Sequence, residues 1–138
     1  VKKSAKKRKA PSAGLIRQAQ RARARAVATF SGFKVGAALE TVRGKAFSGC
    51  NIENASFGLT LCAERVAVFK AVSEGERKFR RIAVVADTAR LTPPCGPCRQ
   101  ILWEFCGDIE VVLANLRGKT RTVRLSELLP DPFDASLL

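Results

Sequence analysis

The sequence contains no histidine, methionine or tyrosine and a single tryptophan among its 138 residues. Without histidine, imidazole is excluded as a general base, as the activator of a nucleophile and as a metal ligand. The longest stretch without a charged residue is the ten residues 54–63, too short to span a bilayer. No apolar run follows the basic N-terminal residues, so the sequence predicts neither a secretory signal nor a membrane helix.

Acidic residues are absent from residues 1–25, which carry ten of the 25 Lys and Arg residues. Residues 26–138 hold all 12 acidic and the other 15 basic residues, so their net charge is only +3. Because its like charges repel, we expect 1–13 to be a disordered basic leader ahead of one globular domain, 14–138. This leader is a candidate for nuclear import or for non-specific contact with nucleic acid or anionic lipid, or it is only a solvated tail.

Hydrophobic periodicity predicts alternating helices and strands. Helices are expected at 15–28, 62–74, 97–105 and from a Ser126 cap to just before Pro130; strands are expected at 35–41, 45–50, 82–86, 109–114 and 120–125. This order predicts an α/β fold, a three-layer α-β-α sandwich with a mixed sheet of about five strands and helices on both faces.

Two of the expected helices begin at cysteines. Cys62 stands two residues before Glu64, and Cys95 and Cys98 form a Cys-Gly-Pro-Cys motif. The partial positive charge of a helix N-terminus favours thiolate, so three sulfurs from two segments can converge on one ion. Soft thiolates select Zn²⁺, and three protein ligands leave the fourth position to water. Five cysteines, an odd number in this pattern, favour a metal site in a reducing compartment such as the cytoplasm over a disulfide framework.

Four short segments match a known pattern. They are Phe-Ser-Gly-Phe-Lys-Val-Gly-Ala-Ala at 30–38, Gly-Cys-Asn-Ile-Glu-Asn-Ala at 49–55, Cys-Ala-Glu-Arg at 62–65 and Pro-Cys-Gly-Pro-Cys-Arg-Gln at 94–100. In this order and spacing they closely resemble the small, homotetrameric cytidine deaminases, which carry the zinc-deaminase signature of a ligand, one residue, Glu and a later Pro-Cys-x-x-Cys. The resemblance implies one Zn²⁺ per subunit and hydrolysis of cytidine or deoxycytidine to uridine or deoxyuridine plus ammonia, a step of pyrimidine salvage.

The same resemblance assigns a role to individual residues. It makes Glu64 the proton shuttle between water and the base, and it makes Arg65 a donor of hydrogen bonds to the ligand sulfurs. The zinc ligands it implies are Cys62, Cys95 and Cys98. The substrate contacts it implies are Phe33, Asn51, Glu53, Ala63 and Phe133, of which Phe133 covers the pocket of a neighbouring subunit.

Each assignment has a structural alternative. Phe33 is also explained by core packing, Asn51 and Glu53 by hydrogen bonds to turn backbone, and Arg65 by a solvated helix surface. The thiols are also explained by a structural zinc site that recruits one of the two remaining cysteines.

Two other functions stay open at this stage: a deaminase that edits RNA or DNA with help from the basic leader, and a non-catalytic zinc protein that binds nucleic acid. A carboxylate at the sugar 3′-hydroxyl, the role given to Glu53, repels a 3′-phosphate and favours nucleosides over polynucleotides.

Overall fold

A computed structural model describes residues 12–138. Most of the predicted basic leader lies outside the described residues. Its last residue, Ala13, was expected to be disordered and instead begins the first helix. Within residues 12–138, no helix combines the length and the apolar character that a membrane crossing requires.

Helices and strands alternate along the described chain in nearly the predicted order. The α-helices are α1 (Ala13–Arg23), α2 (Ala63–Ser73), α3 (Gly96–Cys106) and α4 (Leu125–Leu128), and the strands are β1 (Val35–Thr41), β2 (Ala46–Cys50), β3 (Phe79–Ala86), β4 (Glu110–Ala114) and β5 (Thr120–Arg124). Two 3₁₀ turns, η1 (Phe57–Leu59) and η2 (Ala135–Leu137), complete the secondary structure of this part of the chain.

The strands form one mixed sheet in the order β2-β1-β3-β4-β5. β3 and β4 are parallel, whereas every other neighbouring pair is antiparallel. The C-terminal ends of β2, β3 and β4 therefore lie at the same edge of the sheet as the N-terminal ends of β1 and β5. We call this edge the site edge and the other edge the distal edge.

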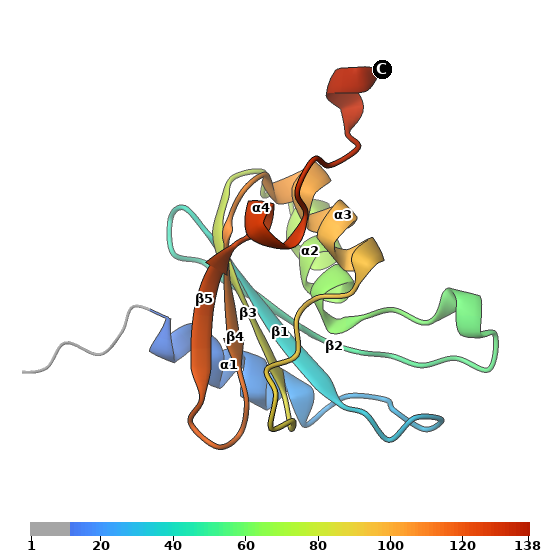
Figure 1. Cartoon of the computed structure of the whole chain (residues 1–138). Helices are drawn as coiled ribbons and strands as arrows, with labels where there is room; N and C mark the ends of the chain where they lie inside the picture. Colours follow the sequence, from blue (N-terminus) through green and yellow to red (C-terminus); the bar gives the residue numbers. More distant parts are fainter. Residues whose placement is uncertain (1–11) are drawn as a thin grey trace, which may run out of the picture.

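Helices cover both faces of the sheet (Figure 1). On one face, α1 packs Leu15 and Ala19 into a cluster with small and β-branched strand residues such as Ala38 and Val85. On the other face, α2, α3 and α4 cover a larger cluster that includes Val68, Leu102 and Leu125. The predicted three-layer α-β-α sandwich with a five-stranded mixed sheet is confirmed.

Two glycines let the helices lie directly against the strands. A Cβ atom at Gly49 of β2 would lie 2.6 Å from the carbonyl oxygen of Ala63, the first residue of α2, and one at Gly36 of β1 would lie 1.9 Å from that of Ala19 in α1. No side chain fits at either position without moving a helix backbone. Gly49 therefore sets how closely the start of α2 approaches the sheet.

Two predicted helix boundaries are wrong. The first helix was expected to reach residue 28 but ends at Arg23, because Val27 pairs with the segment after β2: its N–H donates to Asn51 O at 3.0 Å and its carbonyl accepts from Glu53 N at 2.8 Å. The last helix begins at Leu125, with Arg124 rather than Ser126 at the N-cap.

At that last helix, the side chain of Asp108 does the capping. Its carboxylate accepts hydrogen bonds from the Ser126 N–H at 2.8 Å and the Ser126 hydroxyl at 3.0 Å. A helix N-terminus needs an acceptor for its free N–H groups, and this acceptor comes from a residue 18 positions earlier in the chain. Sequence spacing near the helix therefore does not reveal it.

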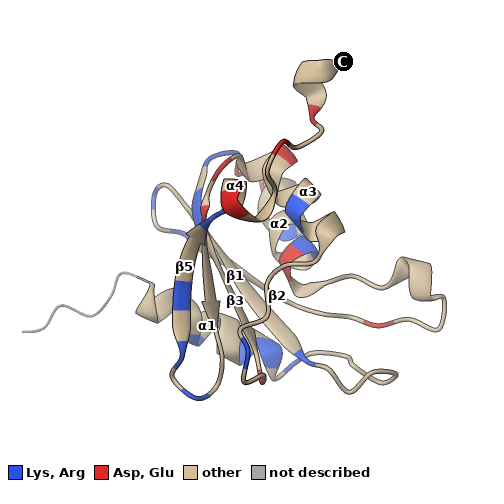
Figure 2. Ribbon diagram, in the orientation of Figure 1, with Lys and Arg blue, Asp and Glu red and all other residues tan. Residues whose placement is uncertain are grey.

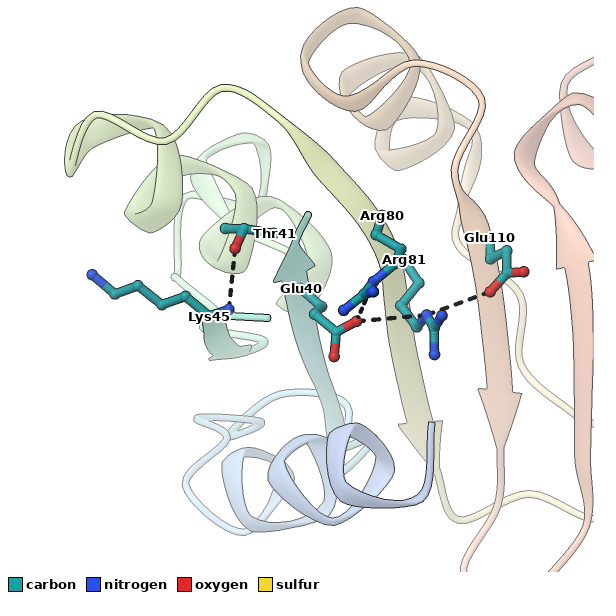
Figure 3. Close-up of polar contacts among 6 residues, drawn as sticks. All are labelled: Glu40, Thr41, Lys45, Arg80, Arg81 and Glu110. Carbon is teal, nitrogen blue, oxygen red and sulfur yellow. Dashed lines mark hydrogen bonds and ion pairs between the residues drawn. The ribbon is translucent and has the colours of Figure 1, made fainter. Parts of the chain in front are cut away.

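The distal edge carries a chain of ion pairs across three strands (Figure 3). Glu40 of β1 lies 2.8 Å from Arg80 Nε and 3.6 Å from Arg81 Nε, and Arg81 Nε lies 3.4 Å from Glu110 of β4. Glu40, Arg81 and Glu110 are direct cross-strand partners. Opposite charges in such positions stabilise a sheet, so this edge serves the fold.

Candidate metal centre and active site

Three thiols converge at the site edge, as the sequence predicts. Cys62 is the N-cap of α2, Cys95 is the N-cap of α3, and Cys98 lies in the first turn of α3. The three sulfur atoms all lie within 4.8 Å of one another, and Cys62 Sγ and Cys95 Sγ are 3.7 Å apart. Both helix N-termini direct partial positive charge at this cluster, which favours thiolate.

The donor set fits a zinc ion. Two thiolates on a tetrahedral zinc with bonds of about 2.3 Å are separated by roughly 3.8 Å, close to the distance between Cys62 and Cys95. Among residues 12–138, the only metal-binding group with this geometry contains these three cysteines and no fourth His, Cys, Asp or Glu ligand. The two remaining cysteines, Cys50 and Cys106, do not belong to this group, which disfavours a closed structural site.

The thiols also influence one another. A hydrogen bond shared with the Cys98 thiol lowers the pKa of Cys62 to about 5. The same bond raises the pKa of Cys98, which is fully buried and retains its proton more strongly. Arg65 adds to the stabilisation of a Cys62 thiolate, since its Nη2 lies 3.5 Å from Cys62 Sγ.

Glu64 lies beside the sulfur cluster and is almost completely buried, with 4 % of its surface exposed. The Cys98 thiol donates to its Oε2 across 3.7 Å. Burial raises the pKa of Glu64 to about 7, because the charged form loses its hydration. A carboxyl group that titrates near neutral pH both accepts and returns a proton readily, which suits general acid–base catalysis.

A cavity of about 250 Å³ opens in front of the sulfurs and Glu64. Its walls come from three segments that are distant in sequence: the loop after α1, the segment from the end of β2 to the start of α2, and the loop before α3. The lining residues are Ser31, Phe33, Val35, Asn51, Glu53, Thr60, Leu61, Cys62, Ala63, Glu64, Thr92, Pro93 and Cys95. In Figure 1 the first two of these segments project together from the lower right of the molecule.

Four of the five predicted substrate contacts line this cavity: Phe33, Asn51, Glu53 and Ala63. Phe33 is 43 % exposed, so core packing does not account for its position. Ala63, the first residue of α2, is fully buried at the base of the cavity.

Asn51 and Glu53 hold the neighbouring loop through hydrogen bonds. Asn51 Oδ1 accepts from Val35 N and Asn51 Nδ2 donates to Phe33 O, both at 2.8 Å. Glu53 accepts from Phe30 N at 2.7 Å, from Ser31 N at 3.1 Å and from the Ser31 hydroxyl, and these bonds lower the pKa of its carboxyl group. Both residues therefore bind turn backbone. Asn51 Oδ1 and Glu53 Oε1 each accept one hydrogen bond and keep a further lone pair for another donor, whereas Glu53 Oε2 already accepts two.

Arg65 is held between the sulfur cluster and the loop before α2. Its Nη2 donates to Thr60 O at 3.2 Å as well as to Cys62 Sγ. Its Nε is buried and has no hydrogen-bond partner among residues 12–138. A solvated helix surface therefore does not describe its surroundings.

Phe133 is the predicted substrate contact that does not line the cavity of its own chain. It is 62 % exposed and lies in the C-terminal segment, which runs past α3 to the end of the molecule opposite the cavity loops (Figure 1). Gln100 Nε2 of α3 donates to Phe133 O at 3.0 Å, and Trp103 Nε1 donates to Asp134 at 2.8 Å. These bonds fix the segment against α3.

Sequence reasoning missed several residues of the cavity wall. Ser31, Thr60, Leu61, Thr92 and Pro93 all line it, and Thr60 supplies a backbone carbonyl to Arg65. Ser31 lies inside one of the four motif segments, so the sequence pattern could have identified it as a cavity residue. No sequence pattern identifies the Thr60 carbonyl as an acceptor, because its availability depends on the path of the loop.

The fold and the three-thiol site define a class of zinc-binding deaminases. The family model described as the cytidine and deoxycytidylate deaminase zinc-binding region matches residues 11–115. The chain therefore belongs to the cytidine and deoxycytidylate deaminase family, and the resemblance of the four sequence segments is confirmed.

Individual relatives narrow the class. The chain is 54 % identical over 122 residues to a cytidine deaminase of Halalkalibacterium halodurans, covering 88 % of this chain and 92 % of the relative. It matches the crystal structure of a cytidine deaminase from Burkholderia pseudomallei with a TM-score of 0.84 and 50 % identity, over 87 % of this chain and 97 % of that chain. It is also 34 % identical over 104 residues to a blasticidin-S deaminase of Bacillus cereus, covering 70 % of this chain and 74 % of the relative.

Proposed function

We propose that this protein is a zinc-dependent cytidine deaminase, which hydrolyses cytidine and deoxycytidine to uridine and deoxyuridine with release of ammonia. The observation that carries the proposal is the position of Glu64. A buried carboxyl group faces a cavity of about 250 Å³ directly beside three convergent thiols. A structural zinc site has no use for such a group.

Cys62, Cys95 and Cys98 would hold one zinc ion per subunit. The chemistry that zinc supplies when bound is Lewis acidity, which makes water a nucleophile at neutral pH. Three thiolates outweigh the charge of one zinc ion and weaken it as a Lewis acid. Arg65 offsets this excess, because its guanidinium group withdraws charge from Cys62 Sγ.

Glu64 moves the protons. Its carboxylate takes a proton from the attacking water and delivers it to N3 of the base as the C4–O bond forms. It then takes the proton of the new C4 hydroxyl group and passes it to the exocyclic nitrogen, so that the C4–N bond breaks, the C4 carbonyl forms and ammonia leaves. Burial supports both transfers, since it raises the pKa of Glu64 to about 7, close to a neutral pH.

The cavity wall positions the nucleoside. Phe33 offers an exposed aromatic face for the pyrimidine ring, and the Ala63 backbone bounds the end at which the base reacts. Asn51 and Glu53 use their free lone pairs to accept from a ribose hydroxyl. A 3′-phosphate would be repelled by Glu53, so the substrate is a free nucleoside rather than a polynucleotide.

Catalysis would take place in a homotetramer. The support is the position of Phe133, which is exposed and does not line the cavity of its own chain but is held in place by α3. Large apolar side chains beside the cavity, among them Phe30, Phe57 and Leu59, are more than half exposed. Contact between copies would cover them.

The five cysteines are all free. Unpaired thiols that bind metal persist in a reducing compartment, which supports a cytoplasmic enzyme of pyrimidine salvage.

The test is metal analysis joined to a turnover assay on the purified chain. We expect one zinc per chain and loss of ultraviolet absorbance, with ammonia release, when cytidine or deoxycytidine is added. Retained zinc without turnover of either nucleoside would identify a structural zinc protein instead. Turnover of cytidine within single-stranded RNA or DNA but not of the free nucleoside would identify an editing enzyme.

A further inference from the structure

A second hollow of about 240 Å³ lies next to the catalytic cavity. Its walls are the loop between β3 and α3 and the turn between β4 and β5. It is lined by Arg90, Leu91, Pro93, Lys119, Thr120 and Arg121. Pro93 also lines the catalytic cavity, so the two hollows lie on either side of one loop. We call the second hollow the basic cleft.

A buried side chain ties the two walls of the basic cleft together. Asn115, only 4 % exposed, ends β4 and donates from Nδ2 to the carbonyl of Thr88 in the opposite wall at 3.0 Å. Its Oδ1 accepts from Arg117 N at 2.9 Å and Lys119 N at 3.0 Å, which shapes the β4–β5 turn. The cleft is thus organised before any ligand binds, and preorganisation reduces the entropic cost of binding.

Three cations line the basic cleft: Arg90, Lys119 and Arg121. No Asp or Glu lines it, and none of the three makes an ion pair with any residue in 12–138. Figure 2 shows blue segments gathered along β5 and the β4–β5 turn at the lower end of the sheet. Unpaired cations around an organised hollow form a site for an anion.

The distal edge shows what basic residues look like when they serve the fold. Arg80 and Arg81 there are paired with Glu40 and Glu110 (Figure 3). A distal hollow lined by Arg43, Arg77 and Lys78 also contains Glu76. Arg77 donates to the carbonyls of Val72 and Glu76 at 2.8 Å, so one of the three cations of that hollow already has hydrogen-bond partners.

The number of charges around the basic cleft indicates the ligand. Two cations suffice to clamp one phosphate, and here three act together. We propose that the basic cleft binds a polyphosphate group, at a site separate from the one that holds the nucleoside substrate.

The test measures binding of inorganic tripolyphosphate to the zinc-loaded full chain by calorimetry. The variant K119A/R121A should weaken binding at least about tenfold, because it removes two charged donors. The matched control R43A/K78A removes the same charge at the distal edge and should change affinity less than about twofold, since distant charges are screened at moderate salt. Circular dichroism and thermal unfolding establish that each variant is folded.

A single variant on the other wall, R90Q, guards against loss of folding in the double variant and should also weaken tripolyphosphate binding. The proposal fails if the cleft variants bind tripolyphosphate as tightly as the unaltered chain, which would place the anion elsewhere, for example on the basic leader. It also fails if orthophosphate binds as tightly as tripolyphosphate.

Comparing the affinity for ATP with that for tripolyphosphate shows whether the cleft recognises a nucleotide or only its phosphates. Affinity for ATP that exceeds affinity for tripolyphosphate, and that falls in K119A/R121A, supports a nucleotide ligand. Equal affinities that fall together in that variant support recognition of the phosphates alone.

Discussion

The two edges of the sheet differ in how their charged residues are placed. At the distal edge, Glu40, Arg81 and Glu110 face one another across three neighbouring strands, and each finds an opposite charge within 4.0 Å. At the site edge, a carboxyl group is buried beside sulfur atoms, and three cations in the basic cleft have no acidic partner among the described residues.

The difference teaches how to separate structural from functional groups in this fold. A paired charge has been used to hold the strands together. A buried carboxyl group, or a cluster of like charges, that the fold retains at a cavity does not hold strands together, and such groups gather at functional sites. Four predictions test this contrast, beginning with the largest expected effect.

Removal of the buried carboxylate should abolish most of the activity. We expect E64Q to lower kcat for cytidine by about 10²–10⁴-fold, because no other group near the base can carry protons, while zinc content stays the same. Turnover and metal analysis measure both quantities on one sample. The exposed Glu104 of α3 offers a matched control, and an E64Q enzyme as active as E104Q would remove Glu64 from the proton route.

Loss of the guanidinium group beside Cys62 should have a smaller effect. We expect R65Q to weaken zinc binding or to lower kcat/KM by about 10–100-fold, because the sulfur loses a charged donor. Competition with a zinc chelator measures the affinity. R43Q, an exposed arginine of the distal edge, is the comparison, and equal zinc affinity and kcat/KM in the two variants would contradict the role of Arg65.

Breaking the ion-pair chain should affect stability and leave catalysis intact. We expect E40Q to lower the free energy of unfolding by about 1–3 kcal/mol, because Arg81 is 14 % exposed and then keeps only Glu110. The exposed pair of Lys45 and Glu74 is the matched control, and E74Q should cost less than about 1 kcal/mol. Urea unfolding compares them. Equal costs, or a fall in kcat for E40Q, would show that the distal edge is not purely structural.

The smallest effect concerns the carboxylate that caps α4. Hydrogen bonds from the Ser126 N–H and hydroxyl, together with Arg124, hold the pKa of Asp108 below its ordinary value of 3.8. The stabilisation is therefore complete above the unfolded pKa and is lost as the pH falls through the lower folded pKa. We expect D108N to cost less than about 1 kcal/mol at neutral pH.

Unfolding curves at several pH values test the sign of this effect. The difference in stability between D108N and the unaltered chain should stay constant from neutral pH down to about pH 5 and shrink below about pH 4. A difference that grows as the pH falls would mean that the charged carboxylate does not stabilise the cap.

Much of the fold could be predicted because local patterns and tertiary contacts agree. The strands at 35–41 and 45–50 and the thiols at the starts of α2 and α3 were all expected from short segments of sequence. Where a tertiary contact competes with a local preference, the prediction was wrong. Helical composition continues past Arg23, but the pairing of Val27 with residues 51 and 53 ends α1 early.

For the candidate site, the sequence alone determined which residue types carry the chemistry. Few ways to activate water remain in a chain that has no histidine but has three cysteines in two short motifs and a glutamate two positions after the first of them. All of these facts can be read from the sequence without knowing the fold. Tertiary structure alone decided what surrounds them: that Glu64 is buried, that Asn51 and Glu53 already bind the backbone of the first cavity loop, that Phe133 lies away from its own cavity, and that Lys119 and Arg121 face Arg90 without an acid between them. The physical reason is that burial, hydrogen-bond partners and neighbouring charges depend on segments that meet only when the sheet and its loops have formed.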